Sequence, residues 1–227
     1  MEMRAVYAGC LAELMEQDRR VCVLDADLAK ASGTRMSMED IGVLRSVPGV
    51  VIFEPVDEVQ LRAAMPVLNA YEGCVYMRLF RKELPTVFDE NYRFDLFKAD
   101  VLKEGRDLSI FVSGFLTRDV LDVQDELRAA GIDAEVVNVH TIKPIDRETV
   151  IASARKTGAV LTVENHNVIG GLHSAVLEAL SEEKIPAVAV GVKDRFGEVG
   201  KMPYLREILG MTKADIVSAA TKAVSLK

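Results

Sequence analysis

Residues 21–42 read VCVLDADLAKASGTRMSMEDIG, and this stretch decides how the chain is organised. Its first part, 21–28, begins apolar and β-branched and turns acidic at Asp25 and Asp27, as a buried parallel strand does where it reaches the surface. A short loop then leads directly into a helix pattern. Because ligands of open α/β sheets gather beyond the carboxyl ends of the strands, we expect the chemistry at residues 25–42.

The composition is that of a globular protein. With 227 residues, 49% of them hydrophobic and 28% charged, the chain can hold one large domain or two small ones, and we expect two. The net charge of −7 argues against a nucleic-acid surface, which needs clustered Lys and Arg. Cys10, Cys22 and Cys74 have neither a C-x-x-C spacing nor a His at ligand spacing, so we expect reduced structural thiols.

No stretch of the sequence predicts a membrane segment. No apolar run approaches the roughly 18 residues that a spanning helix needs. Residues 1–20 are interrupted by charges and lack the apolar core of a signal peptide. We therefore expect a cytoplasmic protein.

Apolar strand patterns and amphipathic helix patterns alternate over residues 1–88, which predicts a doubly wound α/β domain with Ser37 and Asp57 as helix caps. The alternation breaks over 89–104, which we expect to be a linker with a short hairpin-like element. It resumes over 105–227 as a second doubly wound domain, with Thr117 and Asp146 as caps. The predicted strands are 21–28, 50–55, 74–80, 108–114, 134–140, 159–165 and 187–194, and the predicted helices are 2–18, 38–46, 58–70, 117–131, 146–158, 172–183, 203–210 and 212–224.

The most specific segment is VENHNVIGGLHSAV, residues 163–176, which predicts a strand, a turn and a helix. Gly170 and Gly171 allow a close backbone approach at the helix N-terminus, which suits an anion, although a packing or interface turn is the commoner use. Glu164 and His166 could form an acid/base pair, although a hydrogen-bonded surface His is more common. The loop DRFGEVG, residues 194–200, is expected to pack on a neighbouring domain or subunit rather than to act in catalysis.

Two arginines stand at the end of the predicted strand 74–80. Arg78 and Arg81 are three residues apart, so they cannot share one strand face. Arg81, at the emerging end, is the better candidate to bind a phosphate or carboxylate, and a surface pair with Glu83 or Asp89 is the alternative. The sequence has no G-x-S-x-G, P-loop, H-E-x-x-H or G-D-G motif, so the residues alone predict two α/β domains with an unidentified site.

Six segments follow one another in the order DADL, SMEDIGVLRSVPG, IFEPVDEVQLR, YMRLFRKELP, VENHNVIGGLHSAV and DRFGEVG. In this order they resemble the carboxyl-terminal half of transketolase, and most closely the second polypeptide of split bacterial and archaeal transketolases, over nearly the whole chain. The resemblance implies a pyrimidine-binding domain over about residues 1–88 and a transketolase C-terminal domain over about 105–227. It also implies thiamine diphosphate held between protomers, with its pyrophosphate and Mg²⁺ on a separate amino-terminal subunit.

The resemblance implies roles for two residues. Asp27 falls where the family's loop approaches the cofactor, and Arg81 falls where the family binds the phosphate end of the sugar substrate. No residue of this chain is implied as a metal ligand. The implied activity is the transfer of a two-carbon ketol unit between sugar phosphates, by a chain that forms a homodimer and works with the amino-terminal subunit.

The family pattern is interrupted near residues 34–37. Between DADLAKASGT and SMEDIG the family has a long segment with the catalytic glutamate, the aromatic pocket for the aminopyrimidine ring and a His-containing loop, and this sequence has none of it. Either SGTRM continues the loop after DADL, which we favour, or TRMSMED is the family's T-H-x-S-x-E-D with Arg35 at the histidine position. A natural deletion, an engineered deletion, or loop residues omitted from the printed sequence would each explain the gap, and the catalytic residue is unknown.

Other functions fit the same residues. Without the catalytic glutamate, the chain could be a noncatalytic dimerising or regulatory remnant of the family. Within the class, it could be a subunit of a related enzyme, namely 1-deoxyxylulose-5-phosphate synthase or the E1 β subunit of a 2-oxoacid dehydrogenase. A first sheet with only three readable strands leaves apolar surface uncovered, so we expect a partner or dimer interface there.

Overall fold

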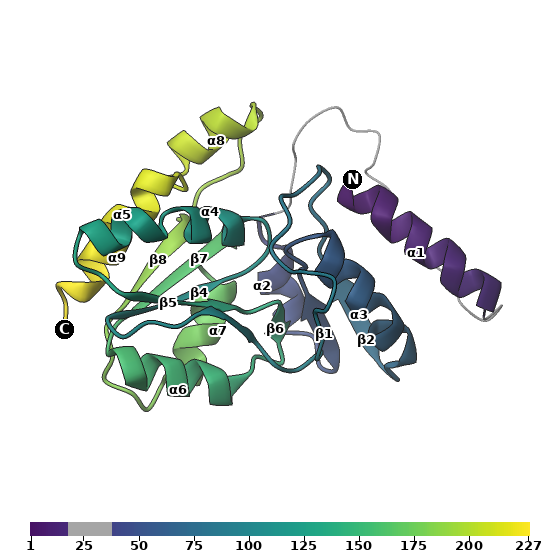
Figure 1. The fold of residues 1–227 in the computed structure, drawn as a ribbon, viewed down its shortest axis with the longest axis horizontal. Helices are drawn as coiled ribbons and strands as arrows, with labels where there is room; N and C mark the ends of the chain where they lie inside the picture. Colours follow the sequence, from purple (N-terminus) through teal and green to yellow (C-terminus); the bar gives the residue numbers. More distant parts are fainter. Residues whose placement is uncertain (18–37) are drawn as a thin grey trace.

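The computed structural model describes residues 1–17 and 38–227, which form two β-sheets with their covering helices (Figure 1). The predicted strand 21–28, the expected cofactor residue Asp27, and Arg35 and Ser37 lie outside the described residues. The helices are α1 (Met3–Gln17), α2 (Asp40–Arg45), α3 (Glu58–Ala70), α4 (Leu116–Asp122), α5 (Gln124–Ala129), α6 (Arg147–Thr157), α7 (Leu172–Ala179), α8 (Met202–Ile208) and α9 (Lys213–Val224). The strands are β1 (Val50–Phe53), β2 (Cys74–Met77), β3 (Asp100–Lys103), β4 (Leu108–Val112), β5 (Ala134–Asn138), β6 (Thr141–Lys143), β7 (Val160–Asn167) and β8 (Ala187–Val192).

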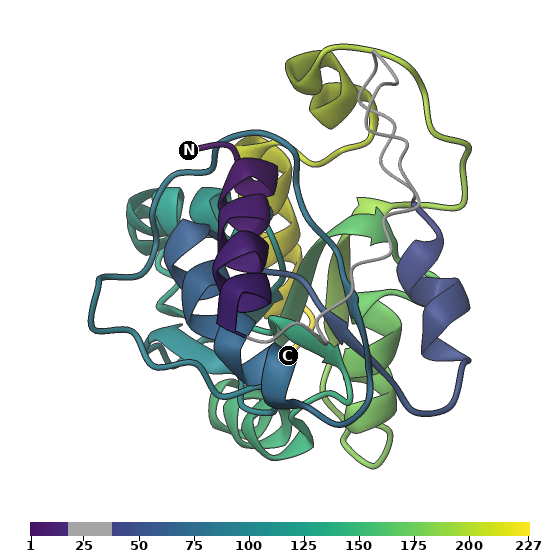
Figure 2. The same cartoon turned by 90° about the vertical axis from the view of Figure 1, so that its right-hand side faces the viewer.

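The first sheet has the strand order β2-β1-β6. β1 and β2 run parallel, with Phe53 opposite Met77, as strands joined by a crossover helix do. That helix is α3, and the predicted cap Asp57 is confirmed, because its Oδ1 accepts from Gln60 N at 2.8 Å. α1 packs against α3, and Figure 2 shows the two helices side by side.

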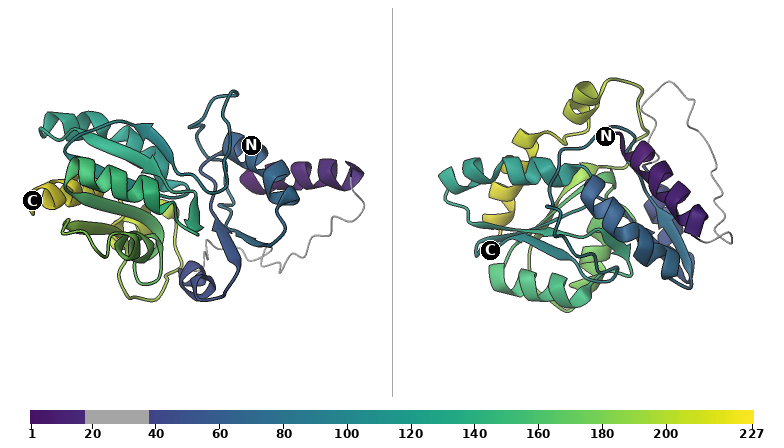
Figure 3. Two further views of the ribbon diagram at one scale, coloured as in Figure 1. Left: turned by 90° about the horizontal axis from the view of Figure 1, so that it is seen from below. Right: turned by 45° about the vertical axis from the view of Figure 1, so that its right-hand side comes forward.

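The second sheet has the order β3-β5-β4-β7-β8, in which only β3, at one edge, is antiparallel to its neighbour. Every residue of β4 and β5 is buried, because helices cover both faces of the sheet (Figure 3). Side chains alternate along β4: Leu108, Ile110 and Val112 pack with α4, α5 and α9, whereas Phe111 packs with α6 and α7. This confirms the predicted doubly wound α/β fold of the second half of the chain.

Two strands differ from the prediction. β6 belongs in sequence to the second half of the chain, yet it joins the first sheet, antiparallel to β1. β3 lies in the stretch predicted as a linker, and it pairs with β5 instead of forming a local hairpin. Both strands are short and take partners from distant parts of the chain, so the local hydrophobic period carries little signal for them. A backbone hydrogen bond also connects the two halves of the chain, because Glu54 N donates to His140 O at 2.8 Å.

The predicted helix caps of the second half are only partly confirmed. Asp146 caps α6, with Oδ1 accepting from Thr149 N at 3.2 Å. Thr117 is not a cap: it lies inside α4, which begins at Leu116 without a side-chain cap. The predicted helix 117–131 also divides at Val123 into α4 and α5.

Two predictions from composition can be compared with the described residues. None of the helices in residues 1–17 and 38–227 has the length and apolarity that crossing a bilayer requires. Cys10 is buried between α1 and α3, Cys74 is exposed at the start of β2, and both are free thiols. Cys22 lies outside the described residues.

Candidate functional site

Charged side chains meet where β1 and β2 end against the second sheet. Arg78 directly follows β2 and is only 4% exposed. Its main-chain N–H donates to Phe53 O at 2.9 Å, which continues the pairing of β1 with β2. Its guanidinium donates to Glu54 Oε1 at 2.5 Å, to Asp40 Oδ2 at 2.9 Å and to Asn165 O at 3.0 Å. These bonds engage all three guanidinium nitrogens, so Arg78 serves the fold and not a ligand.

The carboxylates around Arg78 are shared with neighbouring elements. Glu54 also accepts from Ser113 Oγ at 2.7 Å, and Asp40 accepts from Tyr76 OH at 2.8 Å. Burial acts to lower the pKa of Arg78, but the two carboxylates outweigh it and raise that pKa above its ordinary value. The network contains residues from both sheets and therefore connects them. Removing one member would leave an uncompensated buried charge, which is strongly destabilising.

Glu164 and His166 are both brought to this junction, but not as the acid/base pair considered from the sequence. Glu164 is fully buried, and its carboxylate accepts from Leu172 N at 2.6 Å and from His173 N at 2.9 Å. The nearest approach of Glu164 Oε2 to a nitrogen of His166 is 3.9 Å. Burial raises the pKa of Glu164 to about 8, although the two N–H donors act to lower it. The acceptor at the N-terminus of α7 is therefore this side chain, and no external group is needed there.

His166 is buried, which corrects the expectation of a surface histidine. Its Nδ1 lies 2.6 Å from Asn167 O, and its Nε2 accepts from Ile41 N at 3.1 Å and Gly42 N at 3.4 Å. These partners place the proton on Nδ1 of a neutral ring. Burial lowers the pKa of His166 below its ordinary value.

Arg81, the expected substrate residue, lies in the segment after β2, three residues beyond Arg78. Its side chain is half-buried. The preceding Phe80 stacks on Phe115 of the second half of the chain, with ring centroids 4.5 Å apart. The structure thus separates the two arginines that the sequence places together: Arg78 is used internally, and Arg81 stays the candidate for binding an anion. That role remains a prediction.

Sequence reasoning missed a second polar cluster, which forms between α3, β3 and β5. Gln60 Nε2 donates to Asp100 Oδ2 at 3.0 Å and to Asn138 Oδ1 at 3.1 Å, and Tyr92 OH donates to the same Asp100 oxygen at 2.9 Å. Burial raises the pKa of Asp100 to about 6 and lowers that of nearby His140 to about 4. No spacing in the sequence connects these residues. By contrast, the sequence does carry a signal for Glu54, which is a charged residue immediately after an apolar strand.

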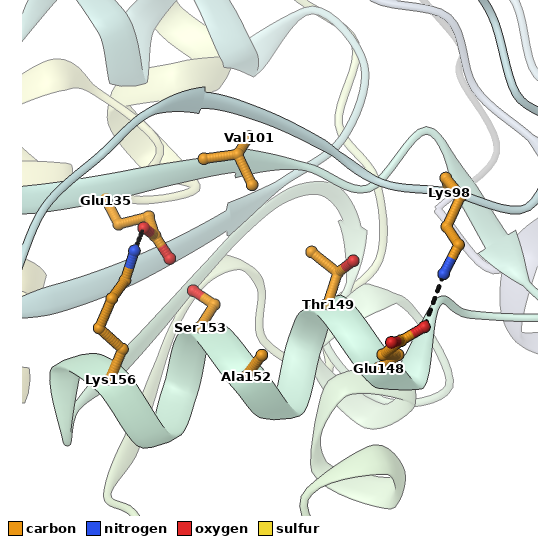
Figure 4. A pocket seen from close by; sticks show the side chains of 8 residues that line it. All are labelled: Lys98, Val101, Glu135, Glu148, Thr149, Ala152, Ser153 and Lys156. Atoms are coloured by element: carbon orange, nitrogen blue, oxygen red, sulfur yellow. Dashed lines mark hydrogen bonds and ion pairs between the residues drawn. The ribbon is translucent and has the colours of Figure 1, made fainter.

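A cavity of about 350 Å³ lies between α6 and the strands β3 and β5 (Figure 4). Its two lysines are already neutralised: Lys98 Nζ lies 2.8 Å from Glu148, and Lys156 pairs with Glu135 and Glu104. Because both cations have carboxylate partners, the cavity offers no free charge to an anionic sugar.

The described part of the chain shows no group of three or more His, Cys, Asp or Glu side chains that could hold a metal ion. The junction of the sheets instead contains carboxylates that are matched by Arg78, by hydroxyl groups or by backbone N–H groups. What the geometry of the described residues provides is a buried, hydrogen-bonded connection between the two sheets, with Arg81 three residues beyond Arg78.

Residues 97–216 match the family model described as transketolase, C-terminal domain. Over 226 residues the chain is 45% identical to the 6-deoxy-6-sulfo-D-fructose transketolase subunit SqwH of Clostridium sp. (strain MSTE9), covering 99% of this chain and 69% of that protein. It is 35% identical over 192 residues to an apulose-4-phosphate transketolase subunit of Phocaeicola vulgatus, covering 84% of this chain and 62% of that protein.

A solved structure described as a split gene transketolase, inactive beta4 tetramer, is similar over the whole chain. It has 34% sequence identity and a TM-score of 0.91, and the match covers 100% of this chain and 99% of that chain. This chain therefore spans roughly two thirds of the length of the two named relatives but nearly all of the chain in that structure.

Proposed function

The chain belongs to the transketolase family, and from this we propose that it is the carboxyl-terminal subunit of a split transketolase. In this proposal it works with a separate amino-terminal subunit to transfer a two-carbon ketol unit between sugar phosphates. The observation that carries the proposal is the similarity to the split gene transketolase, at 34% identity and a TM-score of 0.91 over the whole chain.

The described residues do not form a thiamine diphosphate site by themselves. The carboxyl ends of β1 and β2 are filled by the network of Glu54, Arg78 and Asp40, whose charges are matched internally. The sequence also lacks the family's catalytic glutamate segment and a G-D-G motif for pyrophosphate and Mg²⁺. We assign the bound cofactor and Mg²⁺ chiefly to the amino-terminal subunit, with Asp27 as this chain's expected contribution.

Arg81 is the residue that we assign to the substrate. Its guanidinium can bind a terminal anion with two parallel hydrogen bonds. A sugar phosphate has such an anion, and so has a sulfonated sugar of the kind named for the 45% identical relative SqwH. That identity makes a sulfonated ketose the second candidate substrate.

Binding of thiamine diphosphate, followed by calorimetry, tests the proposal. We expect saturable binding when the chain is mixed with its amino-terminal partner and none with the chain alone. Absence of binding to the assembled pair would favour the noncatalytic dimerising or regulatory remnant. The intact mass belongs to the same experiment: 24.9 kDa means that the segment is missing from the protein itself, and a larger value means that loop residues are present.

Substrate binding is tested separately in the assembled pair. If the pair transfers the ketol unit, Arg81→Ala should raise KM for the anionic ketose about tenfold or more, since a hydrogen bond to a charged group is lost. Lys82→Ala, at the exposed neighbouring position, is the matched control and should leave KM unchanged. Equal KM values for both variants would show that Arg81 does not bind the substrate.

Self-association is proposed for the chain without its partner. The described surface exposes Val43 and Ile169 by 63% each and Phe196 by 94%. Val43 and Ile169 lie on adjoining segments, because a Cβ on Gly42 would be 3.5 Å from Ile169 O, and contiguous exposed apolar side chains mark interaction sites. We expect an oligomer in light scattering of the isolated chain, and a stable monomer would contradict this.

A further inference from the structure

Three consecutive residues of β7 each hold a different point of the first half of the chain. Asn165 O accepts from Arg78 Nη2 at 3.0 Å. His166 Nε2 accepts from Ile41 N at 3.1 Å, and Asn167 N donates to Met38 O at 2.9 Å. Residues 165–167, which the sequence suggested for an anion site or an acid/base pair, therefore connect the two halves of the chain. We call these three residues the clamp.

The contact between β7 and the first turn of α2 depends on one atom, Nε2 of His166. Because the proton of His166 is on Nδ1, which faces Asn167 O at 2.6 Å, the Nε2 lone pair is free to accept from the first turn of α2. The helix has no other side-chain cap, since Glu39 at the N-cap position makes no capping bond. His166 therefore replaces the missing cap from the other domain. α2 also packs beside the start of α7, where Gly42 and Gly170 meet (Figure 2).

An unused acceptor lies beside the same nitrogen. Asp40 Oδ1 is buried without a hydrogen-bond partner among the described residues, and it lies 3.6 Å from His166 Nε2. A buried acceptor left unpaired is costly, so the arrangement favours a donor at this position. If Nε2 took up a proton from solvent, it would stop accepting from Ile41 and Gly42 and could donate to Asp40.

We propose that His166 is a proton-controlled positioning residue, which holds the start of α2 on β7 when neutral and, when protonated, releases the Ile41 and Gly42 amides and pairs with Asp40 instead. α2 begins at Asp40, so its first turn is the end of residues 25–42, the stretch that we expect to carry the chemistry. The clamp therefore decides where that stretch rejoins the fold. The proposal goes beyond the transketolase activity and does not depend on it.

The charges facing His166 come from each element packed against it. Asp40 comes from α2, Glu54 follows β1, Arg78 follows β2, and Glu164 belongs to β7 itself. Burial and Arg78 lower the pKa of His166, whereas the carboxylates of Asp40 and Glu54 raise it, and burial prevails. The release is therefore expected on acidification, at a pH below the ordinary histidine value of about 6.5.

Hydrogen exchange at the Ile41 and Gly42 amides, corrected for intrinsic rates, tests this. In the wild-type chain their protection should fall about threefold to tenfold between about pH 7.5 and the pH at which the ring signal of His166 has titrated, as expected for one lost hydrogen bond. His166→Gln keeps an acceptor near the position of Nε2 but cannot be protonated, so protection should persist at both pH values. His166→Phe has no acceptor, so protection should be low at both.

His173→Gln is the matched control, because His173 is bonded to Thr162 and not to α2, and its exchange should follow the wild type. The proposal is overturned if wild-type protection does not change while His166 titrates, or if His166→Phe is as protected as the wild type. Should His166→Phe fail to fold, the comparison of the wild type with His166→Gln still decides: equal falls in protection on acidification would overturn the proposal.

Discussion

Glu164 Oε2 occupies the space that a side chain at position 171 would need, because a Cβ on Gly171 would lie 2.0 Å from this oxygen. The glycine therefore allows the Glu164 carboxylate to approach the N-terminus of α7 and accept from Leu172 N and His173 N. The close backbone approach that the sequence indicated is real, but the carboxyl group that uses it belongs to the chain.

Gly171→Ala should lower the free energy of unfolding by at least about 2 kcal/mol, because the added methyl group forces Glu164 off its two N–H donors. Gly197→Ala is the control: its Cβ would meet no atom within 4 Å, so we expect a change within about 0.5 kcal/mol. Urea denaturation measures both. Similar stabilities of the two variants would show that the α7 N-terminus tolerates displacement of Glu164.

Arg78→Met should lower the free energy of unfolding by about 3–5 kcal/mol, because it leaves the carboxylates of Glu54 and Asp40 buried without their cation. Arg128→Met is the control, since the Arg128 and Asp125 side chains are 64% and 92% exposed, and should cost less than about 1 kcal/mol. Adding Glu54→Gln to Arg78→Met should recover part of the loss. If the double variant is no more stable than the single one in urea denaturation, buried charge is not the cause.

Asp57→Ala should destabilise both α3 and the segment that follows β2. Asp57 Oδ1 caps α3, and Oδ2 accepts from Val87 N at 2.6 Å and Phe88 N at 2.9 Å. We expect the free energy of unfolding to fall by about 2–4 kcal/mol, because α3 loses its cap and the Val87 and Phe88 N–H groups lose their acceptor. Asp57→Asn keeps one acceptor oxygen and should lose less. Limited proteolysis near Val87 should quicken more in Asp57→Ala, and cleavage as slow as in the wild type would argue against the second role.

Asp100→Asn should change how stability depends on pH. Burial raises the pKa of Asp100 from 3.8 to about 6, so between these values the folded state holds a proton that the unfolded state releases, and this group costs stability as pH rises. The variant keeps an acceptor for Gln60 and Tyr92 without the buried charge. Its stability relative to the wild type should therefore grow from about pH 4 to about pH 6, by at most about 3 kcal/mol.

Thermal or urea unfolding across that pH range measures the effect. Asp125→Asn is the control, because the Asp125 side chain is 92% exposed, and its difference from the wild type should not vary with pH. A pH-independent difference for Asp100→Asn as well would mean that burial does not hold the proton on Asp100.

Much of the fold could be predicted because it depends on local patterns. The helix predicted at 58–70 is α3 with its Asp57 cap, and the buried strands β4 and β5 lie where the apolar runs are. Thr117 failed as a cap because a Thr near a helix start satisfies the pattern whether or not its hydroxyl reaches a backbone N–H. β6 was missed because three residues carry too little periodicity to distinguish a strand from a loop.

The candidate site was less predictable, because its residues meet only after the two halves of the chain pack together. The sequence drew attention to Glu164, His166, Arg78 and Arg81 as polar residues at strand ends and turns. It could not show that Arg78 is held by two buried carboxylates, since Arg78 and Arg81 have the same sequence signature. The expected roles of Asp27 and Arg81 remain predictions.

By itself, the sequence determined the class of the fold, the order of its main elements and, through six ordered segments, the resemblance to transketolase, since alternating period and turn residues are local properties of the chain. Only the tertiary structure decided what the polar residues of VENHN do. The partners of Asn165 and His166 lie 87 and 125 residues away in the chain, and burial between the two sheets turns groups that could have served a ligand into bonds that join the sheets.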